Sequence, residues 1–339
     1  MKSVVIRGVR DLTIEEREIP KPAEGEALLK MLYCGICGSD MGLYKGKMGA
    51  YATFPRVPGH EVSAEIVEIG SNEYGLKRGD IVTVNPYFNC GHCYSCLRGH
   101  VNCCTHNQTM GLARDGAFSE YLVMPVDRLY AGKGLDPKLL ALIEPFCISY
   151  HAAKRGGIRP DDNVLVVGAG TIGVFAMMAA KLLGAKVCVS DVAEAKLKLA
   201  QTLGADYIIF NDDDSRFQEK ANCITGGRGF DVCIEAVGFA SCMMDCANAA
   251  AHRAAVVEVG IPSKPMEFPF DLVQKKELDL RGSRNALRAD FEELIDIALS
   301  GRLNLEAMIT SVYPLDEVAA AFDELDRNPG NNLKTLVKF

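Results

Sequence analysis

The sequence of 339 residues contains no tryptophan, and aromatic residues make up only 7% of it. No apolar stretch approaches the roughly 20 residues that a membrane-spanning helix needs. The first residues mix charges with a short apolar run, as in a strand rather than a secretion signal. Cationic residues are not in excess, because 37 Lys and Arg stand against 44 Asp and Glu. We therefore expect neither nucleic acid nor a membrane as a partner.

Cysteine, in contrast, is plentiful, with thirteen in the chain. The number is odd and most of them lie scattered in apolar segments, which is typical of a reducing compartment where thiols stay free or bind metal. The length exceeds what one compact core usually takes, and 48% hydrophobic residues are ample for folded structure. These properties predict a soluble, cytoplasmic protein of two domains.

Two patterns of secondary structure divide the chain. Short β-rich segments separated by Gly, Pro and Asn turns are expected at residues 4–6, 27–33, 62–69, 81–84 and 118–124. After residue 145, helices ending at 183 and covering 193–203 alternate with strands at 164–167, 186–190, 207–210, 232–236, 256–259 and 278–281. This order predicts a β-barrel-like lobe followed by a doubly wound parallel sheet of the α/β class.

The last part of the chain should return to the first lobe. Helices are expected near residues 291–299 and 315–325, followed by a final strand at 335–339. We place the domain boundaries at 1–146 for the first domain, 147–286 for the doubly wound domain and 287–339 for the returning segment.

Four cysteines in one short loop, at about residues 88–108, predict a structural zinc site. Cys90, Cys93 and Cys96 form two overlapping CxxC steps, and Cys104 follows after a short loop. Thiolates at these spacings can converge on one Zn²⁺ at Zn–S distances of about 2.3 Å, and four sulfurs leave no coordination position for chemistry.

Other interpretations of this loop are a disulfide pair or a set of buried free thiols. The adjacent residues Cys103 and Cys104 suit neither a simple disulfide framework nor a redox CxxC motif. His92, His100 and His106 could substitute as ligands, but four sulfurs already complete the shell. We expect these histidines on the exposed loop.

A glycine-rich turn predicts a dinucleotide site in the second domain. The turn follows the apolar strand at 163–167, opens a helix and reads Gly168-Ala-Gly170-Thr171-Ile172-Gly173. Gly168 permits the tight turn, Gly170 lets the backbone approach a pyrophosphate and Gly173 allows close packing of helix on sheet. An ordinary strand-turn-helix is the alternative.

The next strand ends in Asp191, where a carboxylate can accept both hydroxyls of the adenosine ribose and repel a 2′-phosphate. Val192 follows instead of an arginine, so NAD is favoured over NADP. Lys196, one turn along the following helix, either touches the same ribose or is a solvated side chain.

A second metal signal is spread over distant segments. Cys37, His60 with Glu61, and Glu144 supply a thiolate, an imidazole and carboxylates. Three such ligands with an open fourth position make a catalytic zinc site. Taken singly, they could be a core thiol, a turn residue and a helix-terminal acid.

These motifs together resemble those of the zinc-dependent medium-chain dehydrogenases, the group of sorbitol dehydrogenase and alcohol dehydrogenase, over essentially the whole length. The matching elements are the run from Cys34 to Asp40, Gly59-His60-Glu61, the four-cysteine loop, residues 116–121, Glu144-Pro145 and the nucleotide turn. The resemblance implies a GroES-like catalytic domain, a Rossmann domain, two zinc ions per chain, NAD, and a homo-oligomer that is either a dimer or a tetramer.

The resemblance also implies that Cys37, His60 and a carboxylate hold the catalytic zinc. In the sorbitol dehydrogenase branch that carboxylate is Glu61, with Glu144 reaching the metal through water; in other branches the residue at Glu144 is the direct ligand. Both arrangements stay open at this point.

The expected reaction removes a proton and a hydride from an alcohol. Zinc lowers the pKa of bound water from about 15.7 to about 7, and an alcohol should be acidified similarly. Ser39 can accept the proton and pass it to a ribose hydroxyl of the cofactor. Relatives often carry a histidine five residues after the cysteine ligand, but Gly42 stands here, so Tyr44, Lys45 or water would complete the relay.

The substrate is indicated by residues 282–286, which resemble the corresponding stretch of bacterial hexonate 5-dehydrogenases that act on galactonate or gulonate. Arg284 with Asn285 could bind a substrate carboxylate, because a guanidinium matches its geometry. A surface arginine, an asparagine turn or contacts to the nicotinamide end of the cofactor are the alternatives.

The expected function is therefore NAD-dependent oxidation of a secondary hydroxyl of a sugar acid to the keto acid. A polyol, threonine, butanediol or a simple secondary alcohol is the alternative substrate. A catalytically idle nucleotide-binding or zinc-storage protein is the alternative of a different class.

Overall fold

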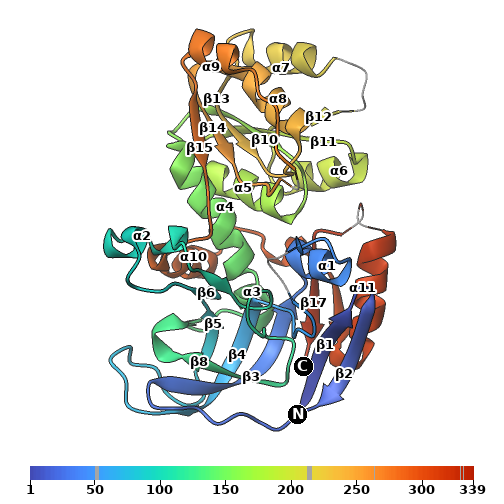
Figure 1. Cartoon of the computed structure of the whole chain (residues 1–339). Helices are drawn as coiled ribbons and strands as arrows, with labels where there is room; N and C mark the ends of the chain where they lie inside the picture. The colour runs from blue at the N-terminus through green and yellow to red at the C-terminus, as the bar shows by residue number, and fades with distance from the viewer. Residues whose placement is uncertain (50–52, 212–215, 263, 329, 331) are drawn as a thin grey trace. The chain divides into compact units, whose positions relative to one another are not determined.

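The computed structural model describes residues 1–49, 53–211, 216–262, 264–328, 330 and 332–339. The chain forms two compact units, the first of Met1–Glu144 with Leu287–Phe339 and the second of Pro145–Ala286 (Figure 1). Over these described ranges, no helix combines the length and the hydropathy of a membrane span.

A seven-stranded sheet organises the first unit. Its order is β16-β17-β3-β4-β5-β9, with β8 also paired to β3. The long strand β3 can pair with both β8 and β17, because its first half pairs with β8 and its last residues pair with β17. The strands are β3 (Glu26–Gly35), β4 (Glu61–Ile69), β5 (Ile81–Val84), β8 (Tyr121–Pro125), β9 (Leu129–Ala131), β16 (Ile309–Pro314) and β17 (Lys334–Lys338).

Shorter elements surround this sheet. Two small antiparallel pairs join β1 to β2 and β6 to β7. The remaining elements of the first unit are β1 (Lys2–Gly8), β2 (Asp11–Glu16), α1 (Gly38–Tyr44), β6 (Tyr87–Phe88), α2 (Tyr94–Leu97), η2 (Val101–Cys103), β7 (Gln108–Thr109), η3 (Val126–Arg128), α3 (Pro137–Leu140), α10 (Arg288–Leu299), η4 (Glu306–Met308), η5 (Leu315–Glu317) and α11 (Val318–Arg327).

The apolar side of α11 closes the core of the first unit. Val318, Ala321 and Phe322 are buried at helical spacing, which puts them on one face of the helix. The ring of Phe322 packs edge-on against Tyr44 at 5.4 Å and Phe118 at 6.2 Å between centroids. The returning segment therefore supplies core residues as well as strand β17.

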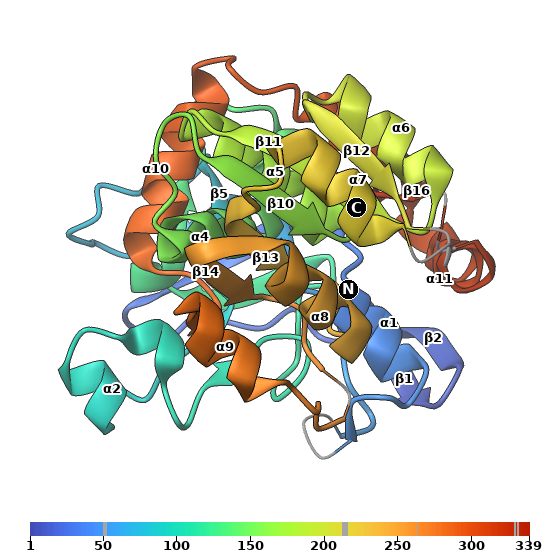
Figure 2. The same cartoon turned by 90° about the horizontal axis from the view of Figure 1, so that it is seen from above.

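The second unit is a six-stranded parallel sheet in the order β12-β11-β10-β13-β14-β15. Helices α7, α8 and α9 neighbour one another over β12 to β14, while α5 packs on β10 and β11 (Figure 2). The elements are α4 (Ile143–Gly156), whose first two residues belong to the first unit, β10 (Asn163–Val167), α5 (Thr171–Leu182), β11 (Lys186–Asp191), α6 (Glu194–Thr202), β12 (Tyr207–Phe210), α7 (Phe217–Thr225), β13 (Phe230–Glu235), α8 (Ala240–Ala249), β14 (Ala250–Glu258), α9 (Phe270–Lys276) and β15 (Asp279–Gly282). The predicted doubly wound α/β sheet is confirmed.

Most predicted strands lie where they were expected, and β5 and β12 coincide with the predicted ranges. Two predicted ranges differ from the structure in their details. The strand predicted at 118–124 begins only at Tyr121, because the backbone N–H of Phe118 donates to the carbonyl of Pro58 and its carbonyl accepts from Val4. The helix predicted at 315–325 is a 3₁₀ turn followed by α11.

The glycine turn of the second unit gives a stability prediction. A Cβ atom at Gly173 would lie 1.7 Å from the carbonyl oxygen of Gly168, whereas a Cβ at Gly170 would meet no atom within 4 Å. We expect Gly173→Ala to lower the free energy of unfolding by about 1–3 kcal/mol or more, as overpacking does. Gly170→Ala, the control, should leave thermal unfolding nearly unchanged. Equal effects of the two variants would contradict this packing.

Candidate active site

A buried carboxylate joins the two segments that carry the predicted zinc ligands. Asp40, on α1, is fully buried, and its two oxygens accept 2.9 Å hydrogen bonds from the backbone N–H of Cys37 and of Gly59. Because His60 follows Gly59, the same side chain fixes the positions of both Cys37 and His60. An Asp40 oxygen also lies 3.9 Å from Nδ1 of His60.

Cys37, His60 and Glu61 form a compact group of potential ligands. One ligand atom from each lies within 4.8 Å of the others. Glu61 is fully buried and opens β4, next to the last residue of β3, Gly35, whose missing side chain leaves room for the carboxylate. A Cβ on Gly35 would lie 1.9 Å from Oε2 of Glu61.

Lys334, which begins β17, neutralises Glu61 in the interior. Its Nζ lies 2.6 Å from both carboxylate oxygens, and both side chains are 2% exposed or less. Burial opposes a charge on Lys334, but Glu61 and then Cys37 outweigh burial and raise its pKa. The pairing of β17 with β3 brings this residue from the far end of the sequence to the site.

Glu144 lies beside this group but outside it. The hydroxyl of Tyr87 donates to its Oε1, and burial raises the pKa of Glu144 to about 7. Of the two acids left open by the sequence, Glu61 is therefore the one gathered with Cys37 and His60 in the described structure.

The charges around His60 fit a bound cation. Burial disfavours an imidazolium, yet Cys37, Asp40 and Glu144 outweigh burial and hold the pKa of His60 well above its usual value. The negative charge around the ring therefore favours a positive charge at this position. A thiolate, an imidazole and a carboxylate in this field are the donor set of a catalytic zinc ion.

Ser39 and the predicted relay residues have different surroundings. Among the described atoms, the buried Oγ of Ser39 has no hydrogen-bond partner, so it can accept one from a substrate. The space at Gly42 is filled by Met48, whose sulfur would lie 2.8 Å from a Cβ there. Tyr44 donates to Asp323 at 3.4 Å, and Lys45 pairs with Asp326 at 2.6 Å.

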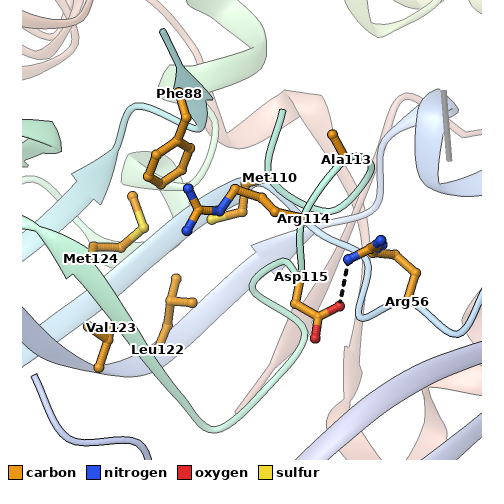
Figure 3. Close-up of a pocket in the computed structure, with 9 residues that line it drawn as sticks. All are labelled: Arg56, Phe88, Met110, Ala113, Arg114, Asp115, Leu122, Val123 and Met124. Carbon is orange, nitrogen blue, oxygen red and sulfur yellow. Dashed lines mark hydrogen bonds and ion pairs between the residues drawn. The ribbon is translucent and has the colours of Figure 1, made fainter. Parts of the chain in front are cut away.

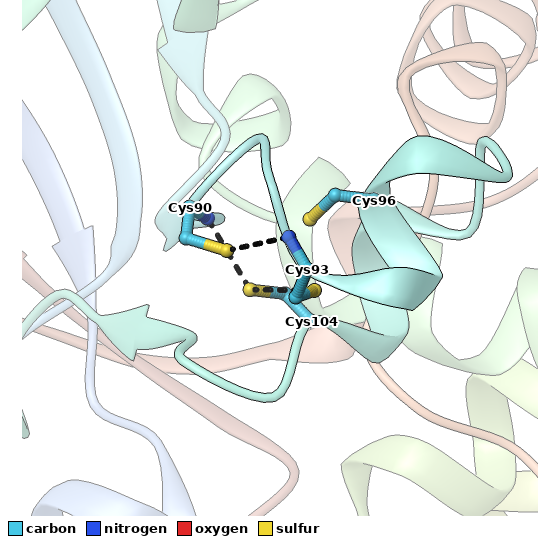
Figure 4. A group of neighbouring side chains, drawn as sticks. All are labelled: Cys90, Cys93, Cys96 and Cys104. Atoms are coloured by element: carbon cyan, nitrogen blue, oxygen red, sulfur yellow. Dashed lines mark hydrogen bonds between the residues drawn. The ribbon is translucent and has the colours of Figure 1, made fainter.

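The four predicted zinc thiolates converge. The sulfurs of Cys90, Cys93, Cys96 and Cys104 lie within 4.8 Å of one another and none is in a disulfide (Figure 4). The Cys93 and Cys104 sulfurs are 3.9 Å apart, and a tetrahedron with Zn–S bonds of 2.3 Å requires about 3.8 Å.

Backbone N–H groups surround these sulfurs. Those of Cys90 and His106 donate to Cys104, and that of Cys93 donates to Cys90, at 3.2–3.4 Å. Hydrogen bonds from the backbone of Cys96 and Thr105 lower the pKa of Cys93 to about 5. Burial raises the pKa of Cys104 to about 11, so a metal has to displace the proton of that thiol.

In the second unit, Asp191 closes the glycine turn onto the sheet. Its carboxylate accepts hydrogen bonds from the N–H of Ala169 at 2.6 Å and of Ala193 at 2.8 Å. The turn itself needs Gly168, whose φ is +104°. Gly170 is the N-cap of α5, which begins at Thr171 and continues through Ile172 and Gly173. Lys196 is half-buried in α6.

Arg284 and Asn285 follow β15 at the carboxyl edge of the same sheet, the edge at which ligands of doubly wound folds bind. Arg284 is exposed. Asn285 adopts the left-handed backbone conformation with φ of +49°.

A separate cavity of about 390 Å³ in the first unit contains none of the predicted site residues. Arg114 lies over the ring of Phe88 at 3.6 Å, and Arg56 pairs with Asp115 at 3.1 Å (Figure 3). Its lining is Arg56, Phe88, Met110, Ala113, Arg114, Asp115, Leu122, Val123 and Met124.

Asp40, Tyr87 and Lys334 also support the candidate site, although none of the three was predicted as a site residue from the sequence. Asp40 stands in the cysteine motif, so its position three residues after Cys37 was a usable signal. Nothing in the local sequence marks Lys334, because only strand pairing brings it to Glu61.

The ion pair of Lys334 with Glu61 gives a prediction. We expect Lys334→Met to lower the free energy of unfolding of the first unit by about 3–5 kcal/mol, because it leaves a buried carboxylate without a partner. Calorimetry with and without chelator should show a larger loss after chelation, since a cation bound to Glu61 would replace part of the missing charge.

Lys2→Met is the matched control. Lys2 also pairs with one acid, Asp316, at 2.7 Å, but both side chains are well exposed, so the change should leave thermal unfolding nearly unchanged. Equal destabilisation by the two variants would contradict a special role for the buried pair.

Two family models match the chain. Residues 23–133 match the alcohol dehydrogenase GroES-like domain, and residues 171–300 match the zinc-binding dehydrogenase domain. L-galactonate-5-dehydrogenase of Escherichia coli K12 is 35% identical over 100% of this chain and 99% of its own. Sorbitol dehydrogenase of Halalkalibacterium halodurans is 30% identical, and the match covers 97% of this chain and 96% of that protein.

Solved structures agree with this relationship. The crystal structure of L-idonate 5-dehydrogenase from Escherichia coli superimposes with a TM-score of 0.90 at 29% identity, covering 100% of this chain and 98% of that one. The chain belongs to the zinc-dependent alcohol dehydrogenases, a family of oxidoreductases that act on CH–OH groups.

Proposed function

We propose that the protein oxidises a secondary hydroxyl of a sugar acid, such as a hexonate of the galactonate or gulonate type, to the keto acid with NAD. The observation that carries the proposal is the group of Cys37, His60 and Glu61, whose ligand atoms lie within 4.8 Å of one another. Ser39, two residues after Cys37 in the sequence, has a buried hydroxyl with no hydrogen-bond partner among the described atoms. An idle zinc-storage protein would have no need of that hydroxyl.

In this proposal Cys37, His60 and Glu61 hold the catalytic zinc. Glu144, which accepts a hydrogen bond from Tyr87, is proposed to reach the metal through water. Cys90, Cys93, Cys96 and Cys104 hold the structural zinc. A zinc ion held there would make the substrate hydroxyl more acidic, and NAD would supply the acceptor for the hydride of the carbon that carries this hydroxyl.

The residues of the chain direct the proton. Ser39 accepts the proton of the substrate hydroxyl and passes its own hydroxyl proton on to a ribose hydroxyl of the cofactor. Lys45 is paired with Asp326 and Tyr44 with Asp323, while Met48 fills the space at Gly42. We therefore assign the last step of the relay to water. The overall change is the loss of one hydride and one proton from the carbinol.

Asp191 is proposed to select NAD. The carboxylate stands beside the glycine turn, fixed by two backbone N–H groups, and would accept ribose hydroxyls while repelling a 2′-phosphate. Lys196 is proposed to contact the same ribose.

Cofactor selection can be measured directly. We expect kcat/KM with NAD to exceed that with NADP by roughly a hundredfold or more, since each 1.4 kcal/mol is about tenfold. Asp191→Ser should narrow the ratio mainly by raising KM for NAD, and Lys196→Ala should change it less. Equal use of NADP by the unmodified enzyme would refute this role for Asp191.

The sugar-acid assignment rests on Arg284 with Asn285. Both follow β15 at the carboxyl edge of the sheet, and a guanidinium can bind a carboxylate through two parallel hydrogen bonds. Two of the similar proteins described above are named for sugar acids, galactonate and idonate. Sorbitol dehydrogenase supports the alternative, a neutral polyol.

A substitution separates the two substrates. We expect Arg284→Ala to lower kcat/KM for a hexonate by about 10²-fold or more, as removal of a charge-assisted pair does. Activity on a neutral polyol should stay nearly unchanged, which NADH formation will report.

Arg253→Ala is the control, since this arginine of the same unit is exposed and pairs only loosely with Glu277 at 3.5 Å. Equal losses on both substrates would place Arg284 in cofactor binding or in the fold. A wild-type preference for a polyol over every aldonate would leave the polyol dehydrogenase as the better assignment.

A further inference from the structure

Two histidines of the four-cysteine loop stand together outside the predicted zinc site. The rings of His92 and His106 are stacked, with centroids 5.9 Å apart and an interplanar angle of 30°. Ligand atoms of His92, His106 and Cys90 all lie within 4.8 Å of one another. Both histidines are exposed, so a cation could reach them from solvent.

Each imidazole is oriented by a hydrogen bond at Nδ1. Nδ1 of His92 lies 2.9 Å from the carbonyl oxygen of Cys90, and Nδ1 of His106 lies 3.1 Å from the hydroxyl of Thr105. A carbonyl can only accept, so Nδ1 of His92 donates and Nε2 is the nitrogen left to bind a metal. Histidines that bind metals in proteins are usually oriented in this way by a bond from their other nitrogen.

The charge of the neighbouring site favours a second cation. Four thiolates around one Zn²⁺ carry a net charge of −2, and the sulfur of Cys90 keeps lone pairs that can bridge to another metal. A cation beside Cys90 reduces this net negative charge, and imidazole ligands do not add to it. This step rests on the structural zinc of the proposed function.

We propose that Cys90, His92 and His106 form an accessory site for a divalent transition metal such as Zn²⁺ or Co²⁺. Imidazole and thiolate are the donors that these metals prefer. Metal–nitrogen bonds of 2.0–2.1 Å and a metal–sulfur bond of 2.3 Å require separations of about 3.3–3.6 Å between ligand atoms, and these three ligand atoms already lie within 4.8 Å of one another. Water completes the shell, so the ion exchanges with solvent.

The test is a metal titration of the whole enzyme after dialysis against a mild chelator. Tight zinc is counted first by mass spectrometry, and Zn²⁺ is then added in a calorimeter. Wild type should bind one further ion. His92→Ala and His106→Ala should each weaken that ion by at least about 10–100-fold, without changing tight zinc or thermal unfolding.

His100→Ala is the matched control, because His100 is exposed on the same loop but is not part of this group. It should titrate like wild type. Identical titrations of wild type and a His92→Ala, His106→Ala double variant would overturn the accessory site. A cobalt complex without a thiolate charge-transfer band would overturn the part assigned to Cys90.

The same samples separate this proposal from the structural zinc. If wild type holds fewer than two tight zinc ions and its loop cysteines react with a thiol reagent, the four-thiolate site fails and the bridging role of Cys90 fails with it. If tight zinc is complete and no further ion binds, only the accessory site fails.

Discussion

Negative charge that is buried around His60 is the constraint on which the candidate site depends. Asp40, Glu61 and Glu144 are all at most 2% exposed, and carboxylates in such positions are costly unless they are paired. Lys334 pairs Glu61, two backbone N–H groups satisfy Asp40, and Tyr87 binds Glu144. In the proposed function a zinc ion balances the charge of Cys37 and the acids, because thiolate, imidazole and carboxylate are donors that zinc binds.

The fold of the first unit brings these groups together from distant parts of the sequence. Strand β3 contributes Gly35 and the start of the cysteine motif, β4 contributes Glu61, and β17 returns from the end of the chain with Lys334. The glycine at position 35 is required because the carboxylate of Glu61 occupies the space of its side chain. In the second unit a glycine is required for the same reason at position 173, because a side chain there would collide with the carbonyl oxygen of Gly168.

Local spacing explains how much the sequence could predict. Cys90 to Cys104 and the turn at Gly168 are short motifs whose geometry is set by a few neighbouring residues, and the alternation of strands and helices is equally local. The contact of Lys334 with Glu61 spans 273 residues, so no local pattern marks it. Met48 fills the space at Gly42, and this contact too is visible only in the three-dimensional structure.

The most direct test of the account is the zinc content of two single variants, Cys37→Ser and Cys104→Ser, purified beside wild type and dialysed against a chelator. Wild type should retain two ions per chain. Cys37→Ser should retain one, with native thermal unfolding and no dehydrogenase activity, whereas Cys104→Ser should retain at most one and unfold at a lower temperature. Two tight zinc ions in Cys37→Ser, with activity intact, would contradict the assignment of the catalytic metal to Cys37, His60 and Glu61.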